Sequence, residues 1–581
     1  MGPDSGRNEV QVGSCAHPGG GAAQRRRRTP GIAAAARIAA GLTTARLTAA
    51  RRAAGVVAAL SAALLAGGPG AVHATQPAPQ SGAHAPPAMD TGVPSEPGIV
   101  RLQADYDARR TTVLAVTQHY LARIQAIDVN GPALKSVLEV NPDAERIAGR
   151  LDERQQPRGL LYGVPVMLKD NIDTADRMHT TAGSLALMDS RPTRDAFLVG
   201  RLRAAGAVIL AKTNMSEWAN FRSKRSSSGW SGRGGQTRNP YATDRDPCGS
   251  SSGSAVAVAA DLTVLAVGTE TDGSIVCPAS MNGIVGLKPT VGLVSRSGII
   301  PISASQDTAG PMARTVTDAA MLLTVLAGYD PEDPATAPLK GRPPVDYRSY
   351  LDADGLKGRR IGVLRQFAGF HEGVDAEFDR ALAALRAHGA ILVDPVRIPD
   401  TDKLGPDELT VLLYEFKDGI NRYLATRQGT GPRTLAELIA FNQANAAREM
   451  PYFLQELFLD AQATDGLMDP RYLQAHERAR RRARAGIDGV LAKYHLAALV
   501  APTMGPAPTI DLINGDHMLG GDVATVAAVA GYPHLTVPMG QVHGLPVGIS
   551  FLGPAWSEGP LLRLGYAYEQ ATHERKPPAL P

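Results

Sequence analysis

The residues most able to carry out chemistry lie between Cys248 and Thr290. This stretch opens with three consecutive serines between glycines, at 249–253, and reaches a second tight turn at 268–274. Small residues let the backbone approach other groups closely, and a serine at a helix start lies among free backbone N–H groups. A hydroxyl nucleophile among such donors is suited to acyl transfer, because the donors stabilise the oxyanion that its attack creates.

Other interpretations of these turns fit less well. Segments rich in Gly and Ser are usually linkers, but these two turns flank an apolar helical pattern and an apolar strand at 263–267, which places them inside a packed unit. A G-x-S-x-G elbow around Ser274 is ruled out, because Asp272 and Val276 stand where it needs glycines. Neither turn ends in the Gly-Lys-Ser/Thr of a phosphate-binding loop.

The same stretch resembles the signature region of the amidase signature family. The family pattern runs roughly GGSSGGS, then GTDTGGSI, then GLKPT, and this chain reads CGSSSGS at 248–254, GTETDGSI at 268–275 and GLKPT at 286–290. The family's lysine pattern, GVPVxxKDN, is matched by GVPVMLKDN at 163–171. The resemblance extends from about residue 100 to the C-terminus.

Three further segments resemble the peptide amidase branch of that family most closely. They read SEWANFRS at 216–223, GGQTRNPY at 234–241 and PISASQDTAGPMAR at 301–314. This branch releases ammonia from C-terminal peptide amides and leaves internal peptide bonds uncut. The resemblance therefore implies an amidohydrolase that acts on linear amides, most closely on C-terminal amides of peptides.

The resemblance also assigns roles to individual residues. It implies that Ser274 attacks the amide carbonyl and forms an acyl-enzyme, that Ser250 relays the proton, and that Lys169 is the final base, a Ser-Lys variant of the catalytic triad. It further implies a cis peptide bond between Gly249 and Ser250. The backbone N–H groups expected to hold the oxyanion are those of Thr271, Asp272, Gly273 and Ser274.

The chain departs from the family pattern at three glycine positions, now Cys248, Ser252 and Asp272. A carboxylate at 272 brings negative charge beside the oxyanion unless the side chain points away and only its N–H serves. Asp272 is thus a candidate for substrate contact, together with Trp218 in the SEWANFRS segment. A lone lysine is usually a solvated surface charge, but Lys169 follows an apolar strand and so emerges from the core.

Cysteine usage and metal motifs add little chemistry. Beyond residue 74 the chain keeps only Cys248 and Cys277. We expect them to be free, packed thiols, although a disulfide between them stays open. A cysteine nucleophile is the competing hypothesis, but no histidine lies near either cysteine in sequence. The chain contains no HExxH or CxxC motif, so neither a metal nor a cofactor is expected.

Alternating helical and strand patterns position these residues. The patterns at 144–151, 164–168, 198–204 and 208–211 favour an α/β fold with helices covering a sheet. The resemblance refines this to a single large domain, 98–581, in which helices cover both faces of a mixed central sheet. Long charged helical patterns within about 345–500 predict a mostly helical lobe in that domain, where we expect substrate preference to be set.

The N-terminal segment has a different composition. Residues 1–74 carry nine arginines, no lysine and two acidic residues, so the chain's formal charge of +4 becomes slightly negative beyond them. That balance suggests no nucleic-acid partner. Arg51-Arg52, an apolar run of 14 residues and Val72-His73-Ala74 predict a signal peptide over about 51–74, with 1–50 an upstream tail. Residues 75–97 have the composition of a disordered linker.

The length of the apolar run bears on where the protein is found. The run at 53–66 is shorter than the about 20 residues that span a bilayer, so we expect an exported, periplasmic or extracellular protein without stable membrane insertion. We also expect a monomer.

The sequence leaves several functions open. Alternatives to peptide amide hydrolysis are an amidase of other small aliphatic or aryl amides and the glutaminase subunit of a tRNA-dependent amidotransferase, which a signal peptide disfavours. An inactive protein that binds amides is the alternative from another class.

Overall fold

A central mixed sheet organises the part of the chain that the computed structural model describes, residues 92–153, 158–189 and 191–580. The predicted upstream tail and signal peptide, and most of the predicted linker, lie outside these residues. The sheet has eleven strands. In spatial order they are β1 Val137–Val140, β3 Val208–Thr213, β2 Pro165–Lys169, β6 Leu265–Glu270, β8 Thr308–Ala313, β7 Val285–Lys288, β12 His534–Val542, β13 Leu545–Leu552, β11 Ala498–Pro502, β9 Arg360–Val363 and β10 Ile391–Val393.

Parallel pairing within the sheet brings Lys169 and the turn at 268–274 together. β2 lies between β3 and β6 and is parallel to both, with Val166 opposite Leu265 and Leu168 opposite Val267. Every residue of β2 and β6 is buried, as expected for continuous apolar strands covered on both faces. Because parallel strands end at the same edge of a sheet, Lys169 at the end of β2 comes close to the turn that follows β6.

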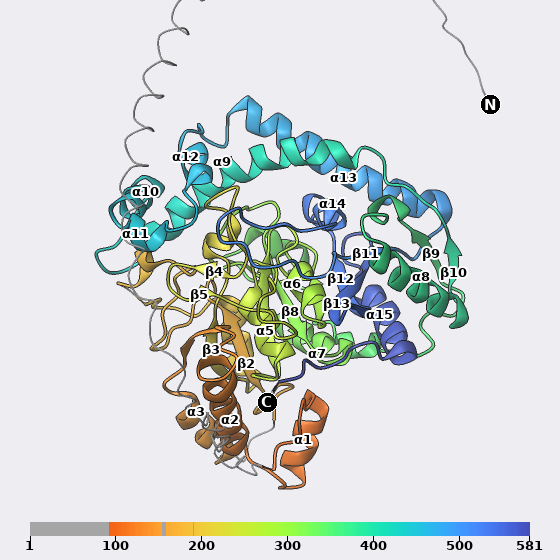
Figure 1. Ribbon diagram of the computed structural model, residues 1–581, viewed down its shortest axis with the longest axis horizontal. Helices are drawn as coiled ribbons and strands as arrows, with labels where there is room; N and C mark the ends of the chain where they lie inside the picture. The colour runs from red at the N-terminus through yellow and green to blue at the C-terminus, as the bar shows by residue number, and fades with distance from the viewer. Residues whose placement is uncertain (1–91, 154–157, 190, 581) are drawn as a thin grey trace, which may run out of the picture. The chain divides into compact units, whose positions relative to one another are not determined.

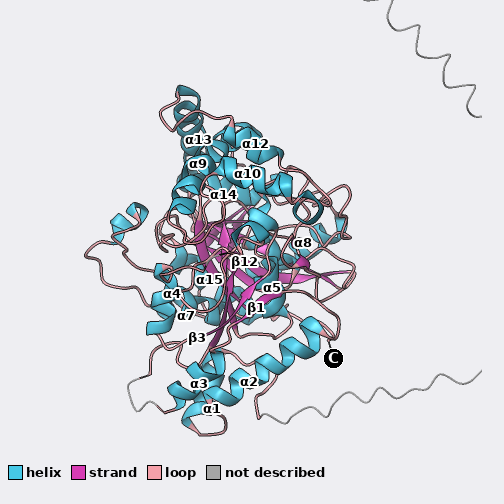
Figure 2. Cartoon of the chain, turned by 90° about the vertical axis from the view of Figure 1, so that its left-hand side faces the viewer, coloured by secondary structure: helices cyan, strands magenta, loops and turns pink. Residues whose placement is uncertain are grey.

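Helices cover the sheet, as the sequence predicts, and Figure 2 shows them around the strands. Helix α5 is buried along its whole length, in keeping with its Ala/Val composition. The α-helices are α1 Ile99–Asp107, α2 Val113–Arg123, α3 Ala144–Asp152, α4 Phe197–Ala204, α5 Ser252–Ala259, α6 Val276–Met281, α7 Val316–Leu326, α8 Glu372–Ala387, α9 Leu404–Ala425, α10 Leu435–Ala444, α11 Ala446–Glu449, α12 Glu456–Gln462, α13 Pro470–Tyr494, α14 Asp522–Ala530 and α15 Glu558–Thr572. A two-stranded sheet, β4 Trp230–Ser231 and β5 Gly235–Gln236, is separate from the central one.

The helical lobe is smaller than the sequence suggested. Helices α9 to α13 form it, and α9 and α13 pack along each other (Figure 1). The first part of the predicted region instead supplies β9 and β10, which extend the sheet at one edge beside β11. These strands are only four and three residues long, so charged helical patterns on either side dominate the local sequence signal. Nowhere in the described ranges is a helix long and apolar enough to cross a bilayer.

Candidate active site

Lys169 lies at the carboxyl end of β2, where no part of its side chain reaches solvent. Its Nζ is 2.7 Å from Ser250 Oγ and donates to the carbonyl of Thr269 at 3.0 Å. Burial lowers the pKa of Lys169 to about 7, against the opposing charges of Glu270 and Asp307. Near neutral pH this amine is therefore available in its uncharged form, which can accept a proton.

Ser250 is presented by a tight turn just before α5. The Gly249–Ser250 peptide bond is cis, as the family resemblance implies. Ser250 is fully buried, and its carbonyl accepts a hydrogen bond from the Ser216 N–H at 3.1 Å. A Cβ added at Gly249 would lie 2.1 Å from Ser216 Oγ, so any side chain at this position would displace the Ser216 hydroxyl.

Ser274 lies directly beside that turn. The N–H of Ser251 donates to the carbonyl of Ser274 at 3.1 Å. The Ser251 hydroxyl also bonds to both backbone groups of Thr269, at 3.0 and 3.2 Å. These contacts fasten the Ser250 turn to the end of β6 and to the turn that carries Ser274. The structure thus brings the three residues of the predicted triad into one place.

A buried carboxylate fixes the backbone around Ser274. Glu270, the last residue of β6, accepts hydrogen bonds from the N–H groups of Ile275 and Val276 at 2.8 and 3.1 Å, and Gly273 N–H also bonds to it. Burial raises the pKa of Glu270, whereas the charge of Lys288 lowers it. The predicted oxyanion donors that Glu270 does not take are the N–H groups of Thr271, Asp272 and Ser274. Glu270 stands within the GTETDGSI motif, but no sequence pattern identified its role.

The two candidate substrate contacts lie apart from each other. The Asp272 carboxylate accepts a hydrogen bond from Thr525 Oγ1 at 2.7 Å, so its side chain is directed toward α14. Trp218 is 2% exposed and packs edge-on against Phe458 of α12, with ring centroids 5.7 Å apart. It therefore belongs to the apolar cluster that packs against α9, α10 and α12 of the helical lobe.

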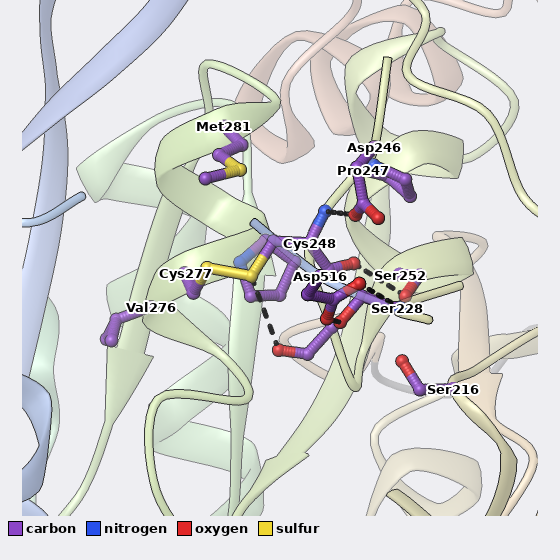
Figure 3. Close-up of a disulfide and its surroundings, with 12 residues drawn as sticks. Ser216, Ser228, Asp246, Pro247, Cys248, Ser252, Val276, Cys277, Met281 and Asp516 are labelled. Carbon is purple, nitrogen blue, oxygen red and sulfur yellow. Dashed lines mark hydrogen bonds between the residues drawn. A yellow bond between two sulfur atoms is a disulfide. The ribbon is translucent and has the colours of Figure 1, made fainter. Parts of the chain in front are cut away.

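The prediction of free thiols was wrong. Cys248 and Cys277 form a disulfide with their Cα atoms 6.0 Å apart (Figure 3). Cys248 directly precedes the Ser250 turn and Cys277 lies in α6, three residues after Ser274. Because the two turns are fastened together through Ser251, the two cysteines are brought within bonding distance. Sequence alone does not show this contact, since 29 residues separate them.

A cavity of about 850 Å³ leads to this site. Its inner wall includes Ser250, Thr269 and Thr271, and its outer wall includes the segment 191–195 and residues of α9. Ser274 is not part of the lining and is 8% exposed. Across the described chain, His, Cys, Asp and Glu side chains form no group of three or more suited to hold a metal ion.

Comparisons with known proteins agree with this geometry. The model of the Amidase family matches residues 115–562. The crystal structure of peptide amidase from Stenotrophomonas maltophilia is 54% identical, with a TM-score of 0.79, and the match covers 83% of this chain and 98% of that one. A "Probable amidase" of Arabidopsis thaliana is 41% identical over 83% of this chain and 91% of its own length.

A glutamyl-tRNA(Gln) amidotransferase component from Chloroflexus aurantiacus is 36% identical over 82% of this chain and 98% of its own length. Matches of this extent cover the region from before β2 into α15, including the turns that carry Ser250 and Ser274. They confirm the fold expected from the sequence, a mixed central sheet covered by helices. The chain belongs to the Amidase family and is an amidohydrolase that acts on C–N amide bonds.

Proposed function

We propose that this amidase hydrolyses C-terminal amides of peptides to the free acid and ammonia, through an acyl-enzyme on Ser274. The observation that carries the mechanism is the contact between Lys169 and Ser250. A buried amine 2.7 Å from a serine hydroxyl, with its pKa lowered to about 7, is a base poised for neutral pH. Ser250 in turn lies beside Ser274, because Ser251 N–H bonds to the Ser274 carbonyl.

In the proposed reaction, protons move along this chain of three residues. Lys169 accepts the proton of Ser250, and Ser250 takes the proton of Ser274 as Ser274 Oγ bonds to the amide carbonyl carbon. The predicted donors that Glu270 does not take, among the N–H groups of Thr271, Asp272 and Ser274, hold the oxyanion. The C–N bond then breaks while the same relay returns the proton to nitrogen, so that ammonia leaves. Water, activated by the same relay, attacks the resulting ester and releases the acid.

This mechanism fixes the acid side of the pH dependence. Because Lys169 must be uncharged to accept a proton, activity should fall as the pH drops below about 7 and level off above it. The lysine pKa is depressed from its ordinary value of 10.5, so the plateau begins well below the pH at which a free lysine would lose its proton.

The proposed substrate rests on the cavity and on similarity. A space of about 850 Å³ on the side of Ser250 and Thr271 can hold the acyl part of a short peptide. The 54% identity to a peptide amidase supports the C-terminal amide of a peptide as the bond that is hydrolysed. Free glutamine should be a poor substrate, because its two charged groups would have to be desolvated in the cavity.

The test is product analysis on an N-protected dipeptide amide. We expect ammonia and the N-protected dipeptide acid in equal amounts, with the internal peptide bond intact. Parallel reactions with glutamine, an aliphatic amide and an aryl amide test the alternatives, including the glutaminase activity suggested by the amidotransferase relatives. Internal fragments, or glutamine turned over faster than the peptide amide, would overturn the proposed substrate; release of no ammonia from any amide would favour an amide-binding protein.

We also propose that the protein is exported, on the signal-peptide pattern at 51–74. The disulfide beside the active site supports this proposal, since disulfides persist mainly in oxidising compartments outside the cytosol.

A further inference from the structure

Two carboxyl groups that the proposed mechanism does not use meet behind the nucleophile turn. Asp272 stands two residues before Ser274, and Glu408 belongs to α9 of the helical lobe. The two side chains are hydrogen-bonded to each other. Thr525 Oγ1 of α14 donates to Asp272 Oδ2 at 2.7 Å, which holds the Asp272 side chain in this direction. Glu408 is 7% exposed and Asp272 is partly buried, so water has limited access to the contact.

Gln306 connects this pair to the oxyanion turn. Its Nε2 donates to Glu408 Oε1 at 2.8 Å and to the carbonyl of Thr271 at 3.3 Å. The Thr271 carbonyl and the Asp272 N–H belong to the same planar peptide group. A contact that fixes the carbonyl therefore also fixes the direction of the N–H, which is one of the predicted oxyanion donors. Hydrogen bonds through Gln306 thus link the Asp272–Glu408 pair to the Thr271–Asp272 peptide group.

Two carboxyl groups in direct contact require a proton between them, because two carboxylates would repel. Burial raises the pKa of both groups, and the Asp272 charge raises that of Glu408 further. The charged groups around Asp272 are Glu270 on β6 and Asp522 on α14, which act in the same direction, and Lys288 on β7, which opposes them. The shared proton is therefore retained well above the pH at which free carboxyl groups ionise.

We propose that Asp272 and Glu408 are positioning residues that share one proton, hold α9 against the nucleophile turn and orient the Asp272 N–H toward the oxyanion. When hydroxide removes that proton at alkaline pH, the two carboxylates repel each other and the donor loses its orientation. The pair thus sets the alkaline limit of amide hydrolysis, whereas Lys169 sets the acid limit. This inference rests on the proposed acyl-enzyme mechanism.

The experiment compares the pH dependence of kcat/KM for wild type, Glu408→Gln and Asp272→Asn. In Glu408→Gln the amide can still donate to Asp272 and accept from Gln306, but it has no proton to lose. In Asp272→Asn the amide can likewise accept from Thr525 and donate to Glu408. We expect wild type to lose activity about tenfold per pH unit beyond its alkaline limit, and both variants to keep that activity for at least one further pH unit.

Matched variants separate positioning from a general structural effect. Glu408→Ala should lower kcat at every pH, and the conservative Glu408→Gln should restore it near neutral pH. Asp488→Asn removes a carboxylate from the exposed side of α13, where it accepts from the Tyr532 hydroxyl at 2.8 Å, and should leave the alkaline limit where it is in wild type.

Several outcomes would overturn the proposal. They are an alkaline limit that both conservative variants retain unchanged, a wild-type profile with no alkaline limit, or a limit that shifts equally in Asp488→Asn. The two single variants are independent, so misfolding of one leaves the other to decide. The profile is measured on whichever amide the enzyme turns over, so a wrong choice of substrate is distinguishable from a wrong role for the pair.

Discussion

At the scale of single residues, Lys169 links activity to stability. Its pKa lies near 7 in the folded protein and near 10.5 in an unfolded chain. Between these values the unfolded chain binds the proton and the folded protein does not, so folding stability rises with pH across this window. Below about 7 the lysine destabilises the fold by a constant amount, and the pKa difference corresponds to about 4–5 kcal/mol. Two hydrogen bonds, to Ser250 and Thr269, belong to the same side chain.

Replacing Lys169 by methionine should therefore abolish turnover and still stabilise the protein. We expect the free energy of unfolding at pH 7 to rise by about 2 kcal/mol, since the lost hydrogen bonds offset part of the relief from burying an ammonium group. Denaturant unfolding at several pH values measures this. The advantage should shrink as the pH rises from 7 toward 10.5, because only above 10.5 is Lys169 uncharged in both the folded and the unfolded state.

Lys212 offers a matched control for this experiment. It is another fully buried lysine, on β3, and its Nζ donates to Thr180 Oγ1 at 2.7 Å and to the Ile172 carbonyl. Lys212→Met should retain acyl-enzyme formation. A Lys169→Met variant that still turns over amides, or one whose stability relative to wild type does not depend on pH, would contradict the assigned role.

At the scale of elements, the site depends on two turns at one edge of the sheet. Their local patterns, small residues next to α5 and α6 and an apolar strand before Lys169, together with the family resemblance, predicted three residues that the structure brings together. The contacts between the turns could not be predicted in the same way. The Cys248–Cys277 disulfide depends on α5 and β6 folding back together, and a contact between segments 29 residues apart leaves no periodic signal in the sequence. The hydrogen bonds from Ile275 and Val276 to Glu270 are local, but a bond within an irregular turn leaves no periodic signal either.

The disulfide should stabilise this pair of turns. A bond closing a loop of this length restricts the unfolded chain, and its removal should lower the free energy of unfolding by about 3 kcal/mol. The Cys248→Ser/Cys277→Ser double variant, compared with wild type by denaturant unfolding, measures this effect. Alkylation of unreduced, denatured wild type should modify neither cysteine; modification of both would show that the thiols are free and that the bond is absent.

At the scale of the whole molecule, the sequence predicted the sheet, its helical cover and the helical lobe, but not the exact extent of the lobe. Strong alternation at 144–211 indicates helix and strand reliably, whereas β9 and β10 are too short to stand out beside α8. The lobe's contact with the nucleophile turn, through Glu408 and Gln306, was also invisible, because charged residues on a helix are usually solvated.

The proposed export predicts a shorter mature protein. Cleavage after Ala74 should leave Thr75 as the first residue. Intact-mass measurement of the protein from the extracytoplasmic fraction checks this, with the cytosolic fraction as control. A full-length mass in the extracytoplasmic fraction, or the absence of the protein from the extracytoplasmic fraction, would contradict the proposal.

The most direct test of the proposed mechanism is to locate the acyl group during turnover. An N-protected peptide amide is mixed with the enzyme, the reaction is quenched in acid within its steady state, and the protein is digested and mapped by mass spectrometry. We expect the peptide acyl group on Ser274, and no acyl adduct in Ser274→Ala. An acyl group on Ser250 or on any other residue, or turnover by Ser274→Ala, would contradict Ser274 as the nucleophile.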